Sequence, residues 1–263
     1  MADDHPGPIG QTGISAAQEA AVVRWGGLSG ILGGIIFVAS IIYQVAFIGT
    51  GTTASGAGPI MRFPGLQTQI AAGQTLFLIG TILMVPLVVS IYRTLRTSSL
   101  APALFGFGLS FLGLAVLAVE SEPNVAMAQI SAQYHAVGAT AAQQDAAVVA
   151  WQATQGIFNE FDTCAYIFLS VGFILFGVGM LRAAGYGRAI GAVTTTIGVV
   201  GIFGVALFPV TSAMFAIPAA LTFVVFPLLL GRTVYRIAPT VEPMSTATDA
   251  PHELRNAPRV EPQ

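Results

Sequence analysis

The residues of this chain best suited to chemistry are four ionisable side chains near the middle of the sequence, Glu120, His135, Glu160 and Asp162. Carboxylate and imidazole groups bind cations, but a metal site needs three or four ligands that converge on one point. The spacing here is scattered, and Glu160 and Asp162, two residues apart, point to different faces of a helix. We interpret the four as a candidate polar site without a predicted metal; a solvated helix entrance is the alternative.

Other kinds of chemistry are excluded by residues that the chain lacks. All ten Lys+Arg residues are arginine, which excludes a Schiff-base lysine. The GLSG sequence at 27–30 is similar to the nucleophile of an intramembrane serine protease, but that chemistry needs a histidine base. The histidines are His5, His135 and His252, all outside the apolar stretches, which also excludes bis-histidine haem ligation. We therefore predict no catalytic residue, no cofactor, no metal and no nucleic-acid partner, and we expect a protein that is not an enzyme.

The elements that would position the candidate site follow from the shortage of charge. Of 263 residues, 54% are hydrophobic and 8% charged, against about 25% charged in soluble domains. A membrane-spanning helix needs about 20 mainly apolar residues, and the charge-free stretches are continuously apolar rather than alternating as in a barrel. They predict an all-α membrane domain over 25–236, a bundle of six transmembrane helices at about 25–48, 69–91, 99–119, 157–181, 189–208 and 214–231.

The arginines indicate how these six spans are oriented. Cytoplasmic loops are enriched in positive charge because such segments resist translocation. Nine arginines fall on one side of the predicted bundle, and only Arg62 falls on the other. The side of Arg62 carries five carboxylates: Glu120, Glu122, Asp145, Glu160 and Asp162. We therefore expect both termini to be cytoplasmic, in the inner (plasma) membrane of a bacterial cell, and the candidate polar site to be on the outer side.

The segments outside the spans divide into two termini and one long outer loop. Residues 1–24 form a cytoplasmic N-terminal segment, and the proline-rich residues 237–263 are predicted to be a disordered cytoplasmic tail. The outer loop connects helices three and four, at about 121–156. Its second half has large apolar residues at roughly helical spacing, so we expect the fourth helix to begin near Ala141 and to extend above the membrane. Those residues are Val148, Trp151, Phe158 and Phe161.

Small residues in the first span predict close helix packing. Gly26, Gly30 and Gly34 recur every four residues and therefore line one helix face. Small residues at this spacing allow two helix backbones to approach closely. The contact is either internal to the bundle, which is the interpretation we favour, or is made with a second copy or another membrane protein.

Prolines in spans two and six predict local breaks. Pro86, Pro218 and Pro227 lie inside these spans, where proline kinks a helix and frees carbonyl groups. Such breaks mark binding sites in many transporters, so a substrate cavity near these prolines is one interpretation. Three amides near the outer ends of spans one and two would either line it or face the membrane interface: Gln44, Gln69 and Gln74.

Two hydrophobic stretches resemble a known family. They are VPLVVSIYRTLRTSSLAPALFGFGLSFLG, a span that ends in a Tyr-Arg-x-Leu-Arg turn, and AYIFLSVGFILFGVGMLRAAGYGRAIGAV, an aromatic-glycine helix that restarts after a glycine turn. Over roughly residues 70 to 205 the chain is similar to the bacterial integral-membrane family called domain of unknown function 4386. The resemblance implies a six-helix architecture and brings no established activity or catalytic residues.

These observations predict a polytopic integral membrane protein whose primary partner is the lipid bilayer. The leading hypothesis is a non-enzymatic accessory or regulatory role, exerted through helix packing and the outer loop. An alternative is a small-solute transporter with a cavity near the proline-kinked helices two and six. A second alternative is a membrane enzyme with an acidic metal site on its outer face.

Overall fold

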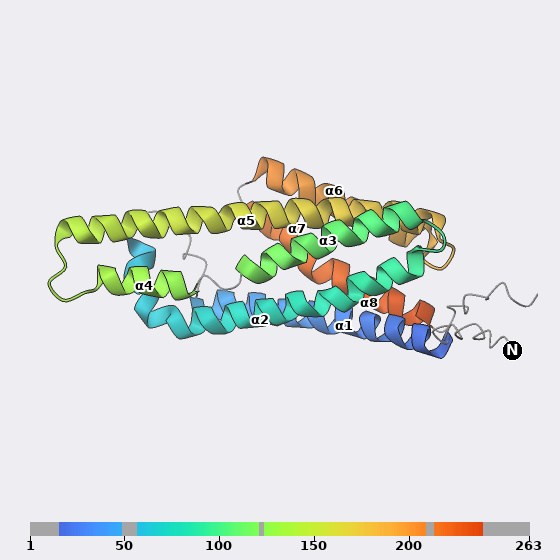
Figure 1. Ribbon diagram of the computed structural model, residues 1–263, viewed down its shortest axis with the longest axis horizontal. Coiled ribbons are helices and arrows are strands. Elements are labelled where there is room, and N and C mark those ends of the chain that lie inside the picture. Colours follow the sequence, from blue (N-terminus) through green and yellow to red (C-terminus); the bar gives the residue numbers. More distant parts are fainter. Residues whose placement is uncertain (1–15, 49–56, 121–123, 209–212, 239–263) are drawn as a thin grey trace, which may run out of the picture.

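A computed structural model describes residues 16–48, 57–120, 124–208 and 213–238. Within these ranges the chain is helical and contains no strand (Figure 1). Six helical segments are long and apolar enough to cross a membrane, which confirms the predicted all-α bundle of six spans. Residues 1–15 of the predicted N-terminal segment and residues 239–263 of the predicted tail lie outside the described residues.

Five of the six spans are nearly uninterrupted helices, and the last is composite. The first span is α1 (Ala16–Tyr43), which continues into the π-helical turn η1 (Gln44–Ile48). The next four are α2 (Gly58–Leu95), α3 (Leu100–Glu120), α5 (Ala141–Arg182) and α6 (Gly187–Leu207). The last span combines η2 (Ala213–Phe215), α7 (Ala216–Ala220), the π-helical η3 (Leu221–Val225) and α8 (Phe226–Ile237). A short helix, α4 (Asn124–Tyr134), lies between α3 and α5.

Two helices are much longer than a membrane requires. The 38 residues of α2 and the 42 residues of α5 correspond to roughly 57 and 63 Å, about twice the 30 Å of the hydrocarbon core. Their first halves therefore project beyond the other spans, and α4 packs against both (Figure 1). A separate small core holds this projecting subdomain together: Ile60, Phe63, Met127, Ala147 and Trp151.

The connection between α3 and α5 differs from the prediction in its first half. That part was expected to be loop, and the structure has helix α4 there. The sequence of α4 has few large apolar residues, so the helix depends on its packing against α2 and α5 more than on its own pattern. The second half agrees with the prediction, because α5 begins at Ala141. Thr140 caps it by accepting a hydrogen bond from the backbone N–H of Gln143.

The two ends of the bundle carry opposite charge. Apart from Arg62, the described arginines lie where α1 and α6 begin and where α2, α5 and α8 end, which we call the arginine-rich end. The opposite end, with the projecting subdomain, is the acidic end. At the arginine-rich end Glu19 pairs with Arg93 and Arg96 at 3.3 and 3.2 Å and so ties α1 to α2. The location of this end in the cytoplasm stays a prediction.

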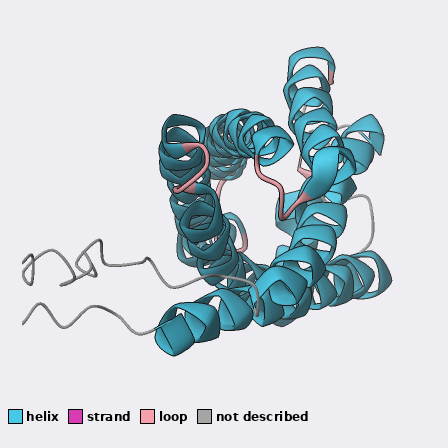
Figure 2. Cartoon of the chain, turned by 90° about the vertical axis from the view of Figure 1, so that its right-hand side faces the viewer, coloured by secondary structure: helices cyan, strands magenta, loops and turns pink. Residues whose placement is uncertain are grey.

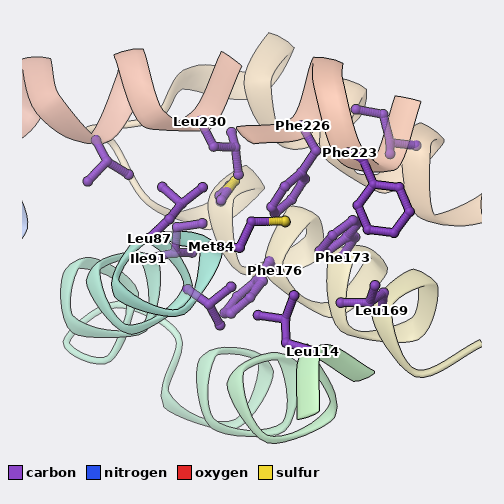
Figure 3. Packing of buried hydrophobic residues seen from close by; sticks show 14 of the residues in the cluster. Met84, Leu87, Ile91, Leu114, Leu169, Phe173, Phe176, Phe223, Phe226 and Leu230 are labelled. Carbon is purple, nitrogen blue, oxygen red and sulfur yellow. The ribbon is translucent and has the colours of Figure 1, made fainter. Parts of the chain in front are cut away.

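The spans form a ring around a packed centre. Each packs on the next, and α8 returns to α1, as the end-on view shows (Figure 2). Side chains from α2, α5 and α8 fill the interior, among them Met84, Leu87 and Phe176 (Figure 3). The rings of Phe173 and Phe226 stack with centroids 3.6 Å apart. Dispersion contacts of this density, rather than polar bonds, hold membrane helices together.

The glycines of the first span pack within the chain. A Cβ at Gly26 would meet the side chain of Ser90 on α2, and one at Gly30 would meet Leu87 of the same helix. Gly34 faces α8 instead, where a Cβ would lie 2.7 Å from Leu228. The three glycines thus make the internal contacts that the first interpretation expects. A homo-oligomer or a partner bound through them stays a prediction.

The prolines affect the two spans differently. Pro218 precedes η3 and Pro227 follows it, so the last span leaves regular α-helical geometry between them. Each proline lacks the backbone N–H that a regular α-helix uses for a hydrogen bond, which explains a departure from α-helical geometry beside it. By contrast, α2 continues as one helix through Pro86. A break in the helical pattern is therefore present in the last span, whereas α2 shows none.

Candidate functional site

The structure separates the four residues of the predicted polar site. Glu120, the last residue of α3, and Asp162 of α5 interact electrostatically with each other. Glu160 is exposed on another face of α5. His135 follows α4, where its Nδ1 lies 2.8 Å from the carbonyl oxygen of Ser131. Two of the four residues therefore meet, and the other two lie elsewhere.

This arrangement does not resemble a metal centre. Among the described residues no group of three or more His, Cys, Asp or Glu side chains is placed to hold a metal ion. The acidic metal site of the second alternative required Glu120, His135 and Glu160 to converge. These side chains lie at the end of α3, after α4 and on α5 without converging, which removes that support.

Glu120 and Asp162 bring two carboxyl groups from different helices near each other. Two ionised carboxylates close together repel each other, so the titration of one depends on the charge of the other.

Glu120 also lines a cavity where the projecting subdomain meets the membrane spans. The cavity has a volume of about 170 Å³. Its walls come from η1, the first half of α2, the end of α3, α4 and the first half of α5. Residues from widely separated parts of the chain thus surround one small space: Gln44, Ile48, Pro59, Arg62, Phe63, Leu66, Ile70, Gln74, Glu120, Met127, Trp151, Gln155 and Phe158.

The walls of the cavity combine apolar and polar surface and include three aromatic rings. Phe63 and Trp151 are only 4% and 7% exposed and contact each other edge to face, with centroids 5.2 Å apart. Phe158 lies one helical turn before Asp162 on α5 and brings the third ring to the cavity. Aromatic faces attract apolar and cationic groups alike. Trp151 therefore serves both the core of the projecting subdomain and the wall of the cavity.

A few polar groups converge on the same space. Gln44 and Gln74, which the sequence left either to a cavity near the prolines or to the membrane interface, line this cavity instead, and Gln69 does not. The amide nitrogen of Gln44 donates to the hydroxyl oxygen of Ser40, which in turn donates to the carbonyl oxygen of Gly73. This chain of bonds joins η1 to α2 and fixes one polar wall.

Close to Asp162 along α5, aromatic side chains from several spans contact one another. Tyr166, one turn after Asp162, is 5% exposed, and its ring lies 4.5 Å from that of Phe215 and 5.4 Å from that of Phe223. Phe223 continues the layer to Phe37, with centroids 4.9 Å apart, and Phe77 contacts both of these rings. We call these five residues the aromatic layer.

Sequence reasoning missed most of the cavity lining. Phe63, Leu66, Ile70, Met127 and Gln155 have no distinguishing spacing in the sequence, because the cavity exists only where α4 and the projecting turns of α2 and α5 meet. The available signals were the amides of Gln44 and Gln74 and the preference of Trp151 for an interface.

The fold and the cavity together define a polytopic helical membrane protein with a small-molecule-sized cavity at one end. No family model, no curated protein and no solved structure matches this chain. The resemblance to domain of unknown function 4386 stays a prediction.

Proposed function

We propose that this protein is a non-enzymatic, multi-pass protein of the bacterial inner membrane that binds a small, partly apolar solute at its acidic end. In this proposal the termini are cytoplasmic, the cavity lies on the outer side, and binding serves an accessory or regulatory role. The observation that carries the proposal is a cavity of about 170 Å³ whose walls combine aromatic and aliphatic side chains with several polar ones. This is the usual composition of a small-molecule site.

The volume limits the size of the solute. A cavity of about 150 Å³ accommodates benzene in another protein. The space beside Phe63 and Trp151 therefore suits a single ring or a comparably small aliphatic body. The amides of Gln44, Gln74 and Gln155 would orient a polar group on such a solute.

The aromatic layer and the position of the cavity favour binding over transport. The rings of the aromatic layer contact one another across α1, α2, α5 and η3, and all are buried except Phe77, which is partly buried. The lining does not include Pro86, Pro218 or Pro227, near which the transport alternative placed its cavity. A carrier would have to part the aromatic layer in every cycle, whereas a solute-binding regulatory protein would not.

Tryptophan fluorescence offers a direct test, because the chain has two tryptophans and only one lines the cavity. Trp25 is 71% exposed at the arginine-rich end, so Trp25→Phe leaves Trp151 as the sole reporter. We expect benzyl alcohol, a neutral probe of suitable size, to change the fluorescence of the purified Trp25→Phe protein saturably. The matched control is Trp151→Phe, in which Trp25 should not respond saturably.

A pair of identical substitutions on one helix locates the binding. Ile70 lines the cavity, while Ile82 is 55% exposed on the outer surface of α2. In the Trp25→Phe protein, Ile70→Phe should weaken the benzyl alcohol response by filling the cavity, and Ile82→Phe should leave it unchanged. If the probe gives no saturable response, or if both substitutions affect it equally, the cavity is not a binding site and the proposal is wrong.

A further inference from the structure

We propose that the groove between α1 and α8 at the arginine-rich end binds the headgroup of an anionic phospholipid, with Arg24 and Tyr235 holding its phosphate. The inference does not depend on the proposed function, because this groove and the cavity at the acidic end have no lining residue in common. It assigns a lipid site to the opposite end of the bundle.

The groove opens where the close contact between α1 and α8 ends (Figure 1). The two helix backbones meet at Gly27, where a Cβ would lie 2.6 Å from the backbone nitrogen of Tyr235. Before Gly27, the side of α1 that lines the groove carries three residues with short side chains: Ala17, Ala20 and Ala21. They leave a groove of about 600 Å³, within the roughly 300–1,000 Å³ that ligand sites occupy.

Two polar side chains, one from each helix, converge in this groove. Arg24 donates a hydrogen bond from Nη2 to the hydroxyl oxygen of Tyr235 at 2.8 Å, and its Cζ lies 5.0 Å from the centre of the same ring. A guanidinium has five N–H donors, so one such bond leaves others for a ligand. The Tyr235 hydroxyl accepts this bond and keeps its own hydrogen as a donor. Donors from both helices are therefore held next to each other at one point.

No carboxylate in the described part of the chain neutralises this point. Glu19 is the one acidic residue described at this end, and it pairs with two arginines of α2. Arg232 and Arg236 add two exposed positive charges on α8, three residues before Tyr235 and one residue after it. Guanidinium N–H groups match the oxygens of a phosphate in geometry and charge. A phosphodiester is therefore the ligand chemistry that this surface favours.

A stripe of apolar side chains continues from the groove along α1. Its members follow one another at intervals of three and four residues and therefore lie on one helix face: Trp25, Leu28, Leu32 and Ile35. The first two line the groove, and Leu32 and Ile35 are exposed further along the span. Tryptophan is favoured at the level of the lipid headgroups. The stripe thus leads from the headgroup level into the region of the acyl chains.

This order of surfaces favours a lipid over a soluble phosphate. A phospholipid carries a phosphate, a glycerol and acyl chains in the same sequence as the Arg24–Tyr235 contact, Trp25 and the apolar stripe. A soluble phosphate would contact only the first of these. The uncompensated arginines also favour an anionic lipid over phosphatidylcholine, whose quaternary ammonium group would lie among positive charges.

Trp25 reports on this groove directly once Trp151→Phe removes the other tryptophan. We expect phosphatidylglycerol brominated near the glycerol end of its acyl chains to quench the fluorescence of the purified Trp151→Phe protein saturably in dodecyl maltoside micelles. The matched control is phosphatidylcholine with the same brominated chains. It should need at least about fivefold more lipid for half-maximal quenching, the factor that corresponds to one basic residue beside anionic lipid.

Two substitutions in the Trp151→Phe protein assign the binding to residues. Arg24→Gln should raise the amount of brominated phosphatidylglycerol needed for half-maximal quenching about fivefold. Tyr235→Phe keeps the ring but removes the hydroxyl donor, so it should raise this amount severalfold. The control is Arg188→Gln, which removes an exposed arginine of α6 at the same end but outside the groove; it should leave the amount nearly unchanged. Circular dichroism checks that each variant keeps its helical content.

Three results would overturn the assignment. Equal quenching by the two brominated lipids would mean that Trp25 contacts surrounding lipid without selection. Equal effects of Arg24→Gln and Arg188→Gln would mean that the overall charge of this end, and not the groove, attracts the lipid. If water-soluble glycerol phosphate relieves the quenching as effectively as unbrominated phosphatidylglycerol does, the groove binds a soluble anion instead.

Discussion

The contact between α1 and α8, which closes the ring of spans, permits a quantitative prediction. A Cβ at Gly27 would lie 2.6 Å from the backbone nitrogen of Tyr235 and 2.8 Å from the carbonyl oxygen of Gly231. Ordinary contact begins near 3.4 Å, and both obstacles are backbone atoms that cannot rotate away. For Gly27→Ala to be accommodated, α1 and α8 must therefore separate by about 0.8 Å along this contact.

The expected cost follows from two opposing effects. Forcing a methyl group into a packed contact costs about 1–3 kcal/mol, and alanine regains up to about 1 kcal/mol through its better helix propensity. We expect Gly27→Ala to lower the free energy of unfolding by about 1–2 kcal/mol. Gly231 meets the same contact from the other side, where a Cβ would lie 2.8 Å from the carbonyl oxygen of Gly27. The double variant should cost less than the sum of the single ones, because one separation serves both methyl groups.

Unfolding of the purified protein in micelles by increasing sodium dodecyl sulfate, followed by circular dichroism, measures these free energies. The control is Gly108→Ala on α3, where a Cβ meets nothing within 4 Å; it should be neutral or slightly stabilising. The reasoning is refuted if Gly27→Ala is as stable as Gly108→Ala, or if the two substitutions at the α1–α8 contact are strictly additive.

Two further predictions concern orientation and pH. In a Cys164→Ala background, Ala142→Cys in the projecting subdomain should react with an impermeant thiol reagent in intact cells, and Thr97→Cys at the arginine-rich end only after permeabilisation; the reverse pattern would show the opposite orientation. Burial raises the pKa of the Tyr186 hydroxyl well above its usual value near 10, and its hydrogen bond with Thr94 offsets this in part. The unfolded chain loses the Tyr186 proton at a lower pH than the folded protein does. The stability that Tyr186 contributes is therefore fully present below about pH 10 and decreases as pH rises further. The free energy of unfolding of the Tyr186→Phe protein should fall less between pH 9 and about pH 11 than that of the unaltered protein, and equal losses would contradict this.

The candidate site was only partly accessible to sequence reasoning. Glu120 and Asp162 were identified as ionisable groups, but spacing along the chain could not show that they interact, since α3 and α5 are separated by α4 and its connections. The different faces of Glu160 and Asp162 were readable, because residues two positions apart on a helix are separated by about 200°. For Gln44 and Gln74 the sequence left open a cavity near the prolines or the membrane interface, and the structure places them in a cavity that contains none of those prolines.

The sequence alone determined the membrane character and the number of spans. Apolar stretches of about 20 residues between charged turns have no stable alternative to helices in a bilayer, because every backbone polar group must be satisfied within its own segment. The charge asymmetry between the two ends follows from the same stretches, because the arginines and carboxylates are confined to the segments between them. The start of α5 at Ala141 was also readable, since capping and helical spacing are local.

Only the tertiary structure decided which faces of these helices meet. The spacing of Gly26, Gly30 and Gly34 predicts one packing face, whereas α1 uses two, one against α2 and one against α8. Helix α4 and the projecting subdomain depend on contacts between residues such as Phe63 and Trp151, which are 88 positions apart in the sequence. The cavity and the Glu120–Asp162 pair arise from the same long-range packing. Local patterns specify helices, and the fit of side chains between helices specifies where a ligand can bind.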